Sequence, residues 1–173
     1  MKFIISPIVL VLIFIVDRFI NFWLIKRENK RNWYLTVLIN PNLEKINLLY
    51  KNLFDLYEKS TVDLSLYNGK DDNLINQKKS EVFGSLSILR RNFEMDFITP
   101  IYAMYPSLSE YLINELLNLE DYLSDNLDSN NYEIEQARKR INESKSNILN
   151  ALYLPVSYLS NKSIEKKLNR IKK

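Results

Sequence analysis

The chain of 173 residues contains no cysteine, no histidine and only two glycines. The absence of cysteine excludes disulfide bonds and thiolate metal ligands, and the absence of histidine removes the usual neutral-pH base and the commonest metal ligand. With only Gly69 and Gly84 available, no glycine-rich phosphate-binding loop of the known kinds can be written. We therefore expect no metal site, no cofactor and no nucleotide-hydrolysing fold.

Catalysis would have to rely on carboxylates, tyrosine, serine and lysine alone. Asp71 and Asp72 fall in an expected loop, and Glu120 and Asp121 fall on the acidic face of an expected helix. Neither pair has an electrophilic partner nearby in the sequence, which a catalytic site would need. We expect that the protein is not an enzyme.

Basic and acidic residues are segregated along the chain, although the formal net charge is only +3. Residues 32–161 contain twelve basic and eighteen acidic residues, whereas residues 162–173 contain six basic residues and one acid. An asymmetry of this kind is typical of a protein oriented on a membrane or on an anionic partner.

The main apolar stretch, residues 3–25, is interrupted only by Asp17, Arg18 and Asn21 among strongly polar residues. As a helix of about 23 residues it is long enough to cover a bilayer core of roughly 30 Å. A shorter interpretation, a signal peptide whose apolar part ends at Val16, lacks the small-residue cleavage site that should follow. We therefore predict a retained transmembrane helix in an anchor region, residues 1–31.

The charges that flank this stretch predict its orientation. Lys26, Arg27, Lys30 and Arg31 follow it, whereas Lys2 is the basic residue that precedes it. The positive-inside bias then predicts a single-pass protein of the inner (cell) membrane with a cytoplasmic C-terminal domain. The lipid bilayer is the first expected partner.

The body, residues 32–160, is expected to be an all-α helical bundle. Apolar residues recur at spacings of three and four in residues 41–59, 74–97, 107–127 and 132–154. Residues 32–40 suit either a helix or a strand, with a helical continuation favoured, and residues 61–67 alternate as a short strand would. The pattern S-x-x-E from Ser107 to Glu110 predicts a capping box, and Gly84 either weakens its helix or permits a close helix contact.

A basic amphipathic tail follows in residues 161–173. Ile164, Leu168 and Ile171 fall on one face of a helix. The opposite face carries Lys166, Lys167, Arg170 and Lys173, which we expect to contact the membrane surface.

The N-terminal helix carries a polar stripe. At 100° per residue Ser6, Asp17 and Asn21 share one face, with Leu10, Ile13 and Phe14 along it. A charge near the bilayer centre costs at least about 2.5 to 3.5 kcal/mol, so Asp17 should face protein or water. A single-pass chain has no second helix to shelter it, which predicts a homo-oligomer.

In such a homo-oligomer Asp17 of one copy would pair with Arg18 of the next, and a closed ring would be a pore with an acidic, cation-favouring lining. The alternative is that Arg18 extends to the interface and pairs locally with Asp17. The predicted pore-lining or oligomer-lining residues are Ser6, Leu10, Ile13, Phe14, Asp17, Arg18 and Asn21.

Two basic clusters in the body could bind an anionic ligand. They are Arg90 with Arg91, and Arg138 with Lys139 and Arg140. The favoured alternative is charge complementation, in which both clusters face the acidic run between Glu110 and Glu135 of a neighbouring helix or of another copy.

One N-terminal helix with a polar stripe, followed by a compact helical domain, is an architecture that resembles the small single-pass membrane effectors of bacterial anti-phage defence systems. Among these is the channel-like partner of Hailong-type systems. The resemblance implies a pore or membrane-disrupting effector controlled by its cytoplasmic domain, and no motif transfers a ligand-binding residue. The alternative function is an anchored scaffold that recruits a cytoplasmic regulatory protein or another partner to the membrane.

Overall fold

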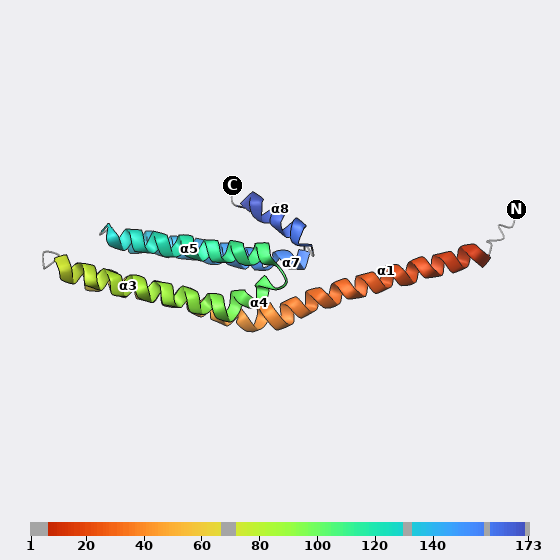
Figure 1. Ribbon diagram of the computed structural model, residues 1–173, viewed down its shortest axis with the longest axis horizontal. Coiled ribbons are helices and arrows are strands. Elements are labelled where there is room, and N and C mark those ends of the chain that lie inside the picture. The colour runs from red at the N-terminus through yellow and green to blue at the C-terminus, as the bar shows by residue number, and fades with distance from the viewer. Residues whose placement is uncertain (1–6, 67–71, 130–132, 158–159, 172–173) are drawn as a thin grey trace.

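The computed structural model describes residues 7–66, 72–129, 133–157 and 160–171, with the side chains of Pro7, Ile8 and Leu10 outside the description. Within these ranges the chain is helical and contains no strand, as the periodicity predicts. The polypeptide forms two parts: a long arm and a helical bundle, which lie end to end in Figure 1.

The arm is α1, Pro7–Trp33. It runs away from the bundle as one continuous helix, and the described N-terminal end of the chain lies at its far tip (Figure 1). A π-helical segment, η1 (Tyr34–Ile39), and a short 3₁₀ turn, η2 (Asn40–Asn42), connect it to the bundle. Residues 32–40 are therefore helical, which was the favoured prediction.

Four long helices build the bundle. They are α2 (Leu43–Ser65), α3 (Asp72–Phe93), α5 (Pro106–Asp128) and α6 (Ile134–Leu152). Helix α2 packs against α3 and α6, and α5 packs against the same two helices from the other side. The π-helical η3 (Glu94–Ile98) and the short α4 (Thr99–Tyr102) link α3 to α5. After α6 come the short α7 (Leu154–Ser157) and α8 (Asn161–Ile171), which packs on α5.

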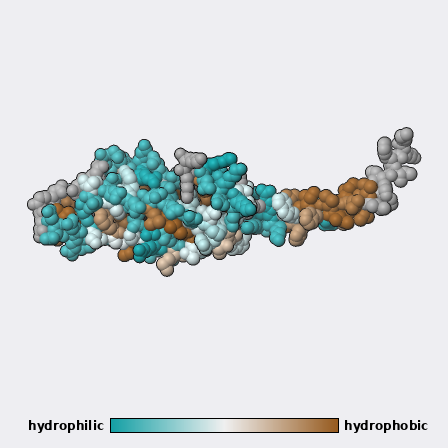
Figure 2. All heavy atoms as spheres, turned by 45° about the horizontal axis from the view of Figure 1, so that its top comes forward, coloured by the Kyte–Doolittle hydropathy of each residue, from teal (hydrophilic) through white to brown (hydrophobic). Residues whose placement is uncertain are grey.

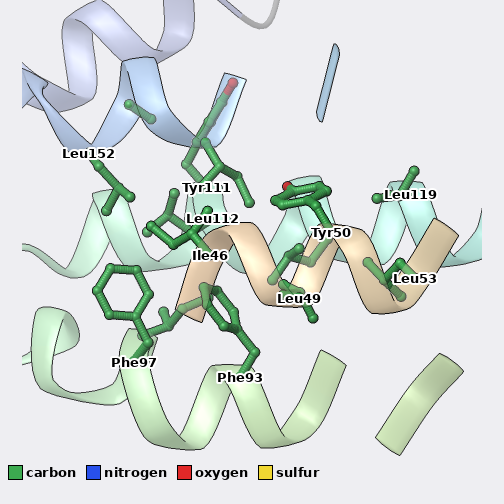
Figure 3. Packing of buried hydrophobic residues seen from close by; sticks show 14 of the residues in the cluster. Ile46, Leu49, Tyr50, Leu53, Phe93, Phe97, Tyr111, Leu112, Leu119 and Leu152 are labelled. Carbon is green, nitrogen blue, oxygen red and sulfur yellow. The ribbon is translucent and has the colours of Figure 1, made fainter. Parts of the chain in front are cut away.

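The predicted apolar stripes meet in one core. Figure 3 shows α2, with Ile46, Tyr50 and Leu53, between Phe93 and Phe97 on one side and Leu112 and Leu119 of α5 on the other, and all seven residues belong to the same buried cluster. Ile46 and Leu112 are fully buried. Burying each such side chain contributes about 1.5 to 3 kcal/mol, so the shared core holds the four helices together.

Two polar contacts inside the core join neighbouring helices. The hydroxyls of Tyr50 and Ser144 are hydrogen-bonded at 3.1 Å, which joins α2 to α6. Lys79 Nζ donates to the backbone carbonyl of Asp128 at 2.7 Å, which joins α3 to the C-terminal end of α5. Buried polar groups of this kind are retained because each is hydrogen-bonded.

The structure corrects the possible strand at residues 61–67. Thr61 and Leu64 lie in α2, which continues to Ser65, and residues 67–71 are outside the described part. The Thr61 hydroxyl donates to the carbonyl of Glu58, and Leu64 is buried in the core. Packing against the core therefore overrides the local alternating pattern.

The predicted capping box at Ser107 is also wrong. Helix α5 begins at Pro106, and its N-cap residue is Tyr105, which makes no side-chain cap hydrogen bond. Proline is preset for the first turn of a helix and lacks the N–H that would need a partner there. The helix therefore starts one residue before the serine.

The sequence predicts a membrane-spanning helix in residues 3–25. In the part of the chain that the structure describes, no helix combines the length and the apolar character needed to cross a membrane. Asp17 and Arg18 interrupt the apolar part of α1, and Lys26, Arg27 and Glu28 follow it directly.

Candidate functional site

The surface of the arm is the most unusual feature of the structure. The described apolar side chains from Val9 to Ile25 are exposed by between 44% for Val9 and 71% for Phe19. Figure 2 shows this stretch as a continuous hydrophobic surface beyond a hydrophilic bundle. Large contiguous apolar surfaces mark sites that contact protein or membrane, because water alone does not stabilise them.

The polar residues of the arm interact within one turn of the helix. Asn21 Nδ2 donates a hydrogen bond to Asp17 Oδ2 at 3.0 Å, so these two side chains lie together on one face. The guanidinium of Arg18 lies 5.1 Å from the centre of the Phe14 ring. In this described helix the local Asp17–Arg18 pair of the alternative interpretation does not form.

The other predicted lining residues are distributed as follows. Ile13 and Phe14 are each 58% exposed on the arm. Leu10 lies in α1, although its side chain is not described, and Ser6 lies outside the described residues. The arm thus brings Phe14, Asp17, Arg18 and Asn21 into two neighbouring pairs.

The junction between the arm and the bundle is tightly packed. The Tyr34 hydroxyl donates a hydrogen bond of 2.8 Å to the backbone carbonyl of Leu152, the last residue of α6. The rings of Tyr34 and Tyr105 meet edge to face with centres 5.4 Å apart. Lys30 Nζ lies 5.2 Å from the centre of the Tyr105 ring. These contacts fix the base of the arm to α6 and to the start of α5.

The junction tyrosines sit in an apolar environment. Burial is the main reason why the pKa of Tyr34 is raised far above its ordinary value, and the nearby Tyr105 and Tyr153 raise it further. The Tyr105 hydroxyl is buried without a hydrogen-bond partner among the described residues. The ring of Tyr34 is fully buried in the core of the bundle.

The first basic cluster is divided between the interior and the surface. Arg90 on α3 pairs with Glu94 at the start of η3 and with Glu120 on α5, and the Ser87 hydroxyl also donates to Glu120. Burial lowers the pKa of Arg90, but its bonds to Glu120 and Glu94 raise it overall. Arg91 is exposed. Charge complementation therefore accounts for Arg90.

The second basic cluster lies on α6, on the diagonally opposite side of the bundle. Arg140 pairs with Glu115 of α5 at 3.5 Å. Arg138 lies 4.8 Å from the Phe54 ring centre and 3.2 Å from a carboxylate oxygen of Glu135. Lys139 is exposed, with Glu143 at 3.9 Å. The fold therefore does not bring the two basic clusters together into one anion site.

The basic tail forms α8. Ile164 and Leu168 are buried, and the helix packs on α5. Lys166 and Arg170 are exposed and Lys167 is half-buried, while Lys173 lies outside the described residues. Two of the three residues predicted for the apolar face of the tail are therefore used for packing within the bundle, whereas Ile171 is 41% exposed, and the basic face remains available.

Sequence reasoning missed the role of Lys79. Its side chain is only 9% exposed and its ammonium lies 3.4 Å from Asp128 Oδ1. The sequence pattern does indicate that Lys79 is buried, because it lies at helical spacing from Val82 and Leu86 on the face of α3 that packs inward.

Comparison of the sequence with protein-family models found no match. Comparisons with curated proteins and with solved structures likewise found none.

Proposed function

We propose that this protein is a membrane-embedded, self-associating helical protein whose arms form a gated pore or another membrane-disrupting assembly under the control of the bundle. The observation that carries the proposal is the arm itself. It combines an exposed apolar surface with a hydrogen-bonded Asp17–Asn21 pair in the middle of that surface.

The dimensions of the arm suit a bilayer. At 1.5 Å per residue, Pro7 and Arg27 are about 30 Å apart along the axis, which is close to the thickness of the hydrocarbon core. Asp17 lies midway between them. When the arm is embedded with Lys26 and Arg27 at one surface, Asp17 is therefore at the depth where a carboxylate is most costly.

Self-association supplies the shelter that one copy lacks. Asn21 satisfies one bond of the Asp17 carboxylate, which can accept several hydrogen bonds. Neighbouring arms that enclose this face would supply the remaining donors, including Arg18 of the next copy, and would turn Ile15, Phe19 and Phe22 towards lipid. The proposal applies to arms within such an assembly rather than to a lone helix.

An assembly with Asp17 on its inner side supports ion passage. A ring of carboxylates favours cations, and Ile13 and Phe14 near it provide an apolar constriction that can close by losing its water. The contacts of Tyr34 with Leu152 and Tyr105 attach each arm firmly to its bundle. A change in the bundle would therefore be transmitted to the base of the arm.

The experiment is a cation-leak assay on liposomes that contain the purified full chain, combined with a mass measurement of the detergent-extracted assembly. We expect an oligomer and a leak, and we expect Asp17→Leu and Asn21→Leu each to reduce the leak at least tenfold. The matched control is Phe19→Leu, on the opposite side of the arm, which should leak like the unmodified protein.

Two results would contradict the proposal. A monomer in detergent whose Asp17→Leu variant behaves identically would remove the case for self-association. An oligomer that leaves liposomes tight would favour the anchored scaffold, which recruits a cytoplasmic partner instead of passing ions.

A further inference from the structure

In the described part of the chain, exposed aromatic side chains are confined to one end of the molecule. Among the described residues, the large aromatic side chains that are exposed lie either on the arm or at its junction with the bundle. Those at the junction are Trp33, Tyr102 and Tyr153, which are 46%, 61% and 42% exposed. The described aromatic residues in the rest of the bundle are buried or half-buried.

These three aromatic residues lie on or next to three separate elements that meet at the junction. Trp33 ends α1, Tyr102 ends α4, and Tyr153 directly follows α6. Each is a near neighbour in sequence of a buried residue at the junction, where Tyr34 contacts both Tyr105 and Leu152. Helix α7 packs against η1, and α4 packs against the start of α5, which carries Tyr105 just before it; Figure 1 shows both short helices at the end of the bundle from which α1 extends.

Exposed cations lie beside the aromatic residues. Lys30 and Arg31 are exposed in the last turn of α1, immediately before Trp33. Together with Trp33, Tyr102 and Tyr153 they form a surface that we name the junction collar. Tyrosine and tryptophan favour the membrane–water interface because their rings are apolar and their tips are polar, and basic residues favour anionic headgroups.

From this arrangement we propose that the junction collar binds the headgroup layer of an anionic phospholipid membrane and holds the bundle against the bilayer surface. The inference rests on the proposed embedding of the arm. Two observations favour lipid as the occupant: the positive charge of Lys30 and Arg31, and the position of Trp33 on α1 itself, about two helical turns beyond the end of its apolar surface at Ile25.

The depth of the collar agrees with this occupant. Trp33 lies about 24 Å from Asp17 along the helix axis, and half of a bilayer with its headgroups is roughly 20 to 22 Å thick. An arm with Asp17 at the midplane and a modest tilt therefore places Trp33 at the outer edge of the headgroup layer. Lys30 and Arg31 then lie within that layer.

The test uses the two tryptophans as depth reporters in the full chain. Trp23→Phe leaves Trp33 as the only tryptophan, and Trp33→Phe leaves Trp23. Each variant is reconstituted into phosphatidylcholine vesicles with and without phosphatidylserine, which carry quenchers either at the headgroups or deep in the acyl chains. We expect headgroup quenchers to quench Trp33 severalfold more than deep quenchers, and we expect this preference to increase with phosphatidylserine.

A charge variant separates lipid binding from simple proximity. Lys30→Gln with Arg31→Gln should lower the phosphatidylserine-dependent quenching of Trp33 severalfold, since each basic residue near an anionic surface strengthens binding about fivefold. The matched control is Lys45→Gln with Lys51→Gln, two exposed lysines on α2. That control should leave the quenching unchanged.

The outcomes distinguish this inference from the function proposed above. If Trp33 is insensitive to both quenchers while the arm reporter Trp23 is quenched, the collar does not bind lipid, although the arm is embedded. If neither tryptophan is quenched, both proposals fail. If the Lys30 and Arg31 variant behaves like the α2 control, anionic headgroups are not the partner of the collar.

Discussion

Arg90 links two helices of the bundle through a buried charge network, and its removal should destabilise the fold strongly. The Arg90, Glu120 and Glu94 side chains are only 12%, 15% and 19% exposed. Arg90→Met would leave both carboxylates without their guanidinium, and Ser87 would remain as a donor to Glu120 alone. Breaking a fully buried pair costs about 3 to 5 kcal/mol, whereas an exposed pair contributes about 0 to 1 kcal/mol. For this mostly buried network we expect a loss of about 2 to 4 kcal/mol.

Urea unfolding of the full chain in mild detergent, followed by circular dichroism, measures this loss. The midpoint should fall while the dependence of the unfolding free energy on urea stays the same. Arg91→Met is the matched control, because Arg91 is exposed on the same helix, and it should cost less than about 0.5 kcal/mol.

A triple variant, Arg90→Met with Glu94→Gln and Glu120→Gln, should recover much of the lost stability because it leaves no buried charge unpaired. The reasoning is refuted if Arg90→Met unfolds at the same urea concentration as Arg91→Met, since the network would then contribute no more than a surface charge.

Three further predictions concern single positions. Gly84 lies in α3 where an added Cβ would meet nothing within 4 Å. Gly84→Ala should therefore stabilise the protein by about 0.5 to 1 kcal/mol in the same urea assay. A loss of stability would indicate a close contact at this position. Tyr34→Phe removes the hydrogen bond to the Leu152 carbonyl and should lower the free energy of unfolding by about 1 to 3 kcal/mol. Backbone amides in η1 should also exchange faster with solvent, and unchanged exchange would show that this bond does not fix the arm. Burial raises the pKa of Tyr34 and Tyr50 above the ordinary value of 10.0, so the folded state holds these protons more tightly than the unfolded state does. Their contribution to stability is complete below about pH 10 and falls as the pH rises above it. Unfolding measured at increasing alkaline pH should detect this fall, and the free energy of unfolding of the Tyr34→Phe variant should depend less on pH.

The helices of the bundle could be predicted because their apolar periodicity is strong. Ile46, Tyr50, Leu53 and Tyr57 are predicted to share one face of a helix, and all four are buried in the structure. The π-helical segments at Tyr34–Ile39 and Glu94–Ile98 could not be predicted from the same apolar periodicity. A change of one residue in hydrogen-bond spacing hardly alters an apolar pattern over so few residues.

In the candidate site, only contacts between residues close in sequence could be predicted. Asp17 and Asn21 are one turn apart, so their shared face follows from helix geometry, and the structure joins them by a hydrogen bond. The bond from Tyr34 to Leu152 joins residues 118 positions apart and depends on the whole fold. The junction collar was missed for the same reason, since Tyr105 and Leu152, the buried neighbours of Tyr102 and Tyr153, contact Tyr34 only after the bundle has formed.

Basic side chains occupy two different environments in this protein, and the sequence alone does not distinguish these environments. Arg90 and Arg140 each pair with a glutamate of α5, so their charges are used between helices of the bundle. Lys30 and Arg31 are exposed at the base of the arm, beside exposed aromatic rings. An anionic partner would therefore meet paired charges at these two positions on the bundle and available charges at the junction. This contrast favours a membrane surface that meets the molecule at the end from which the arm extends.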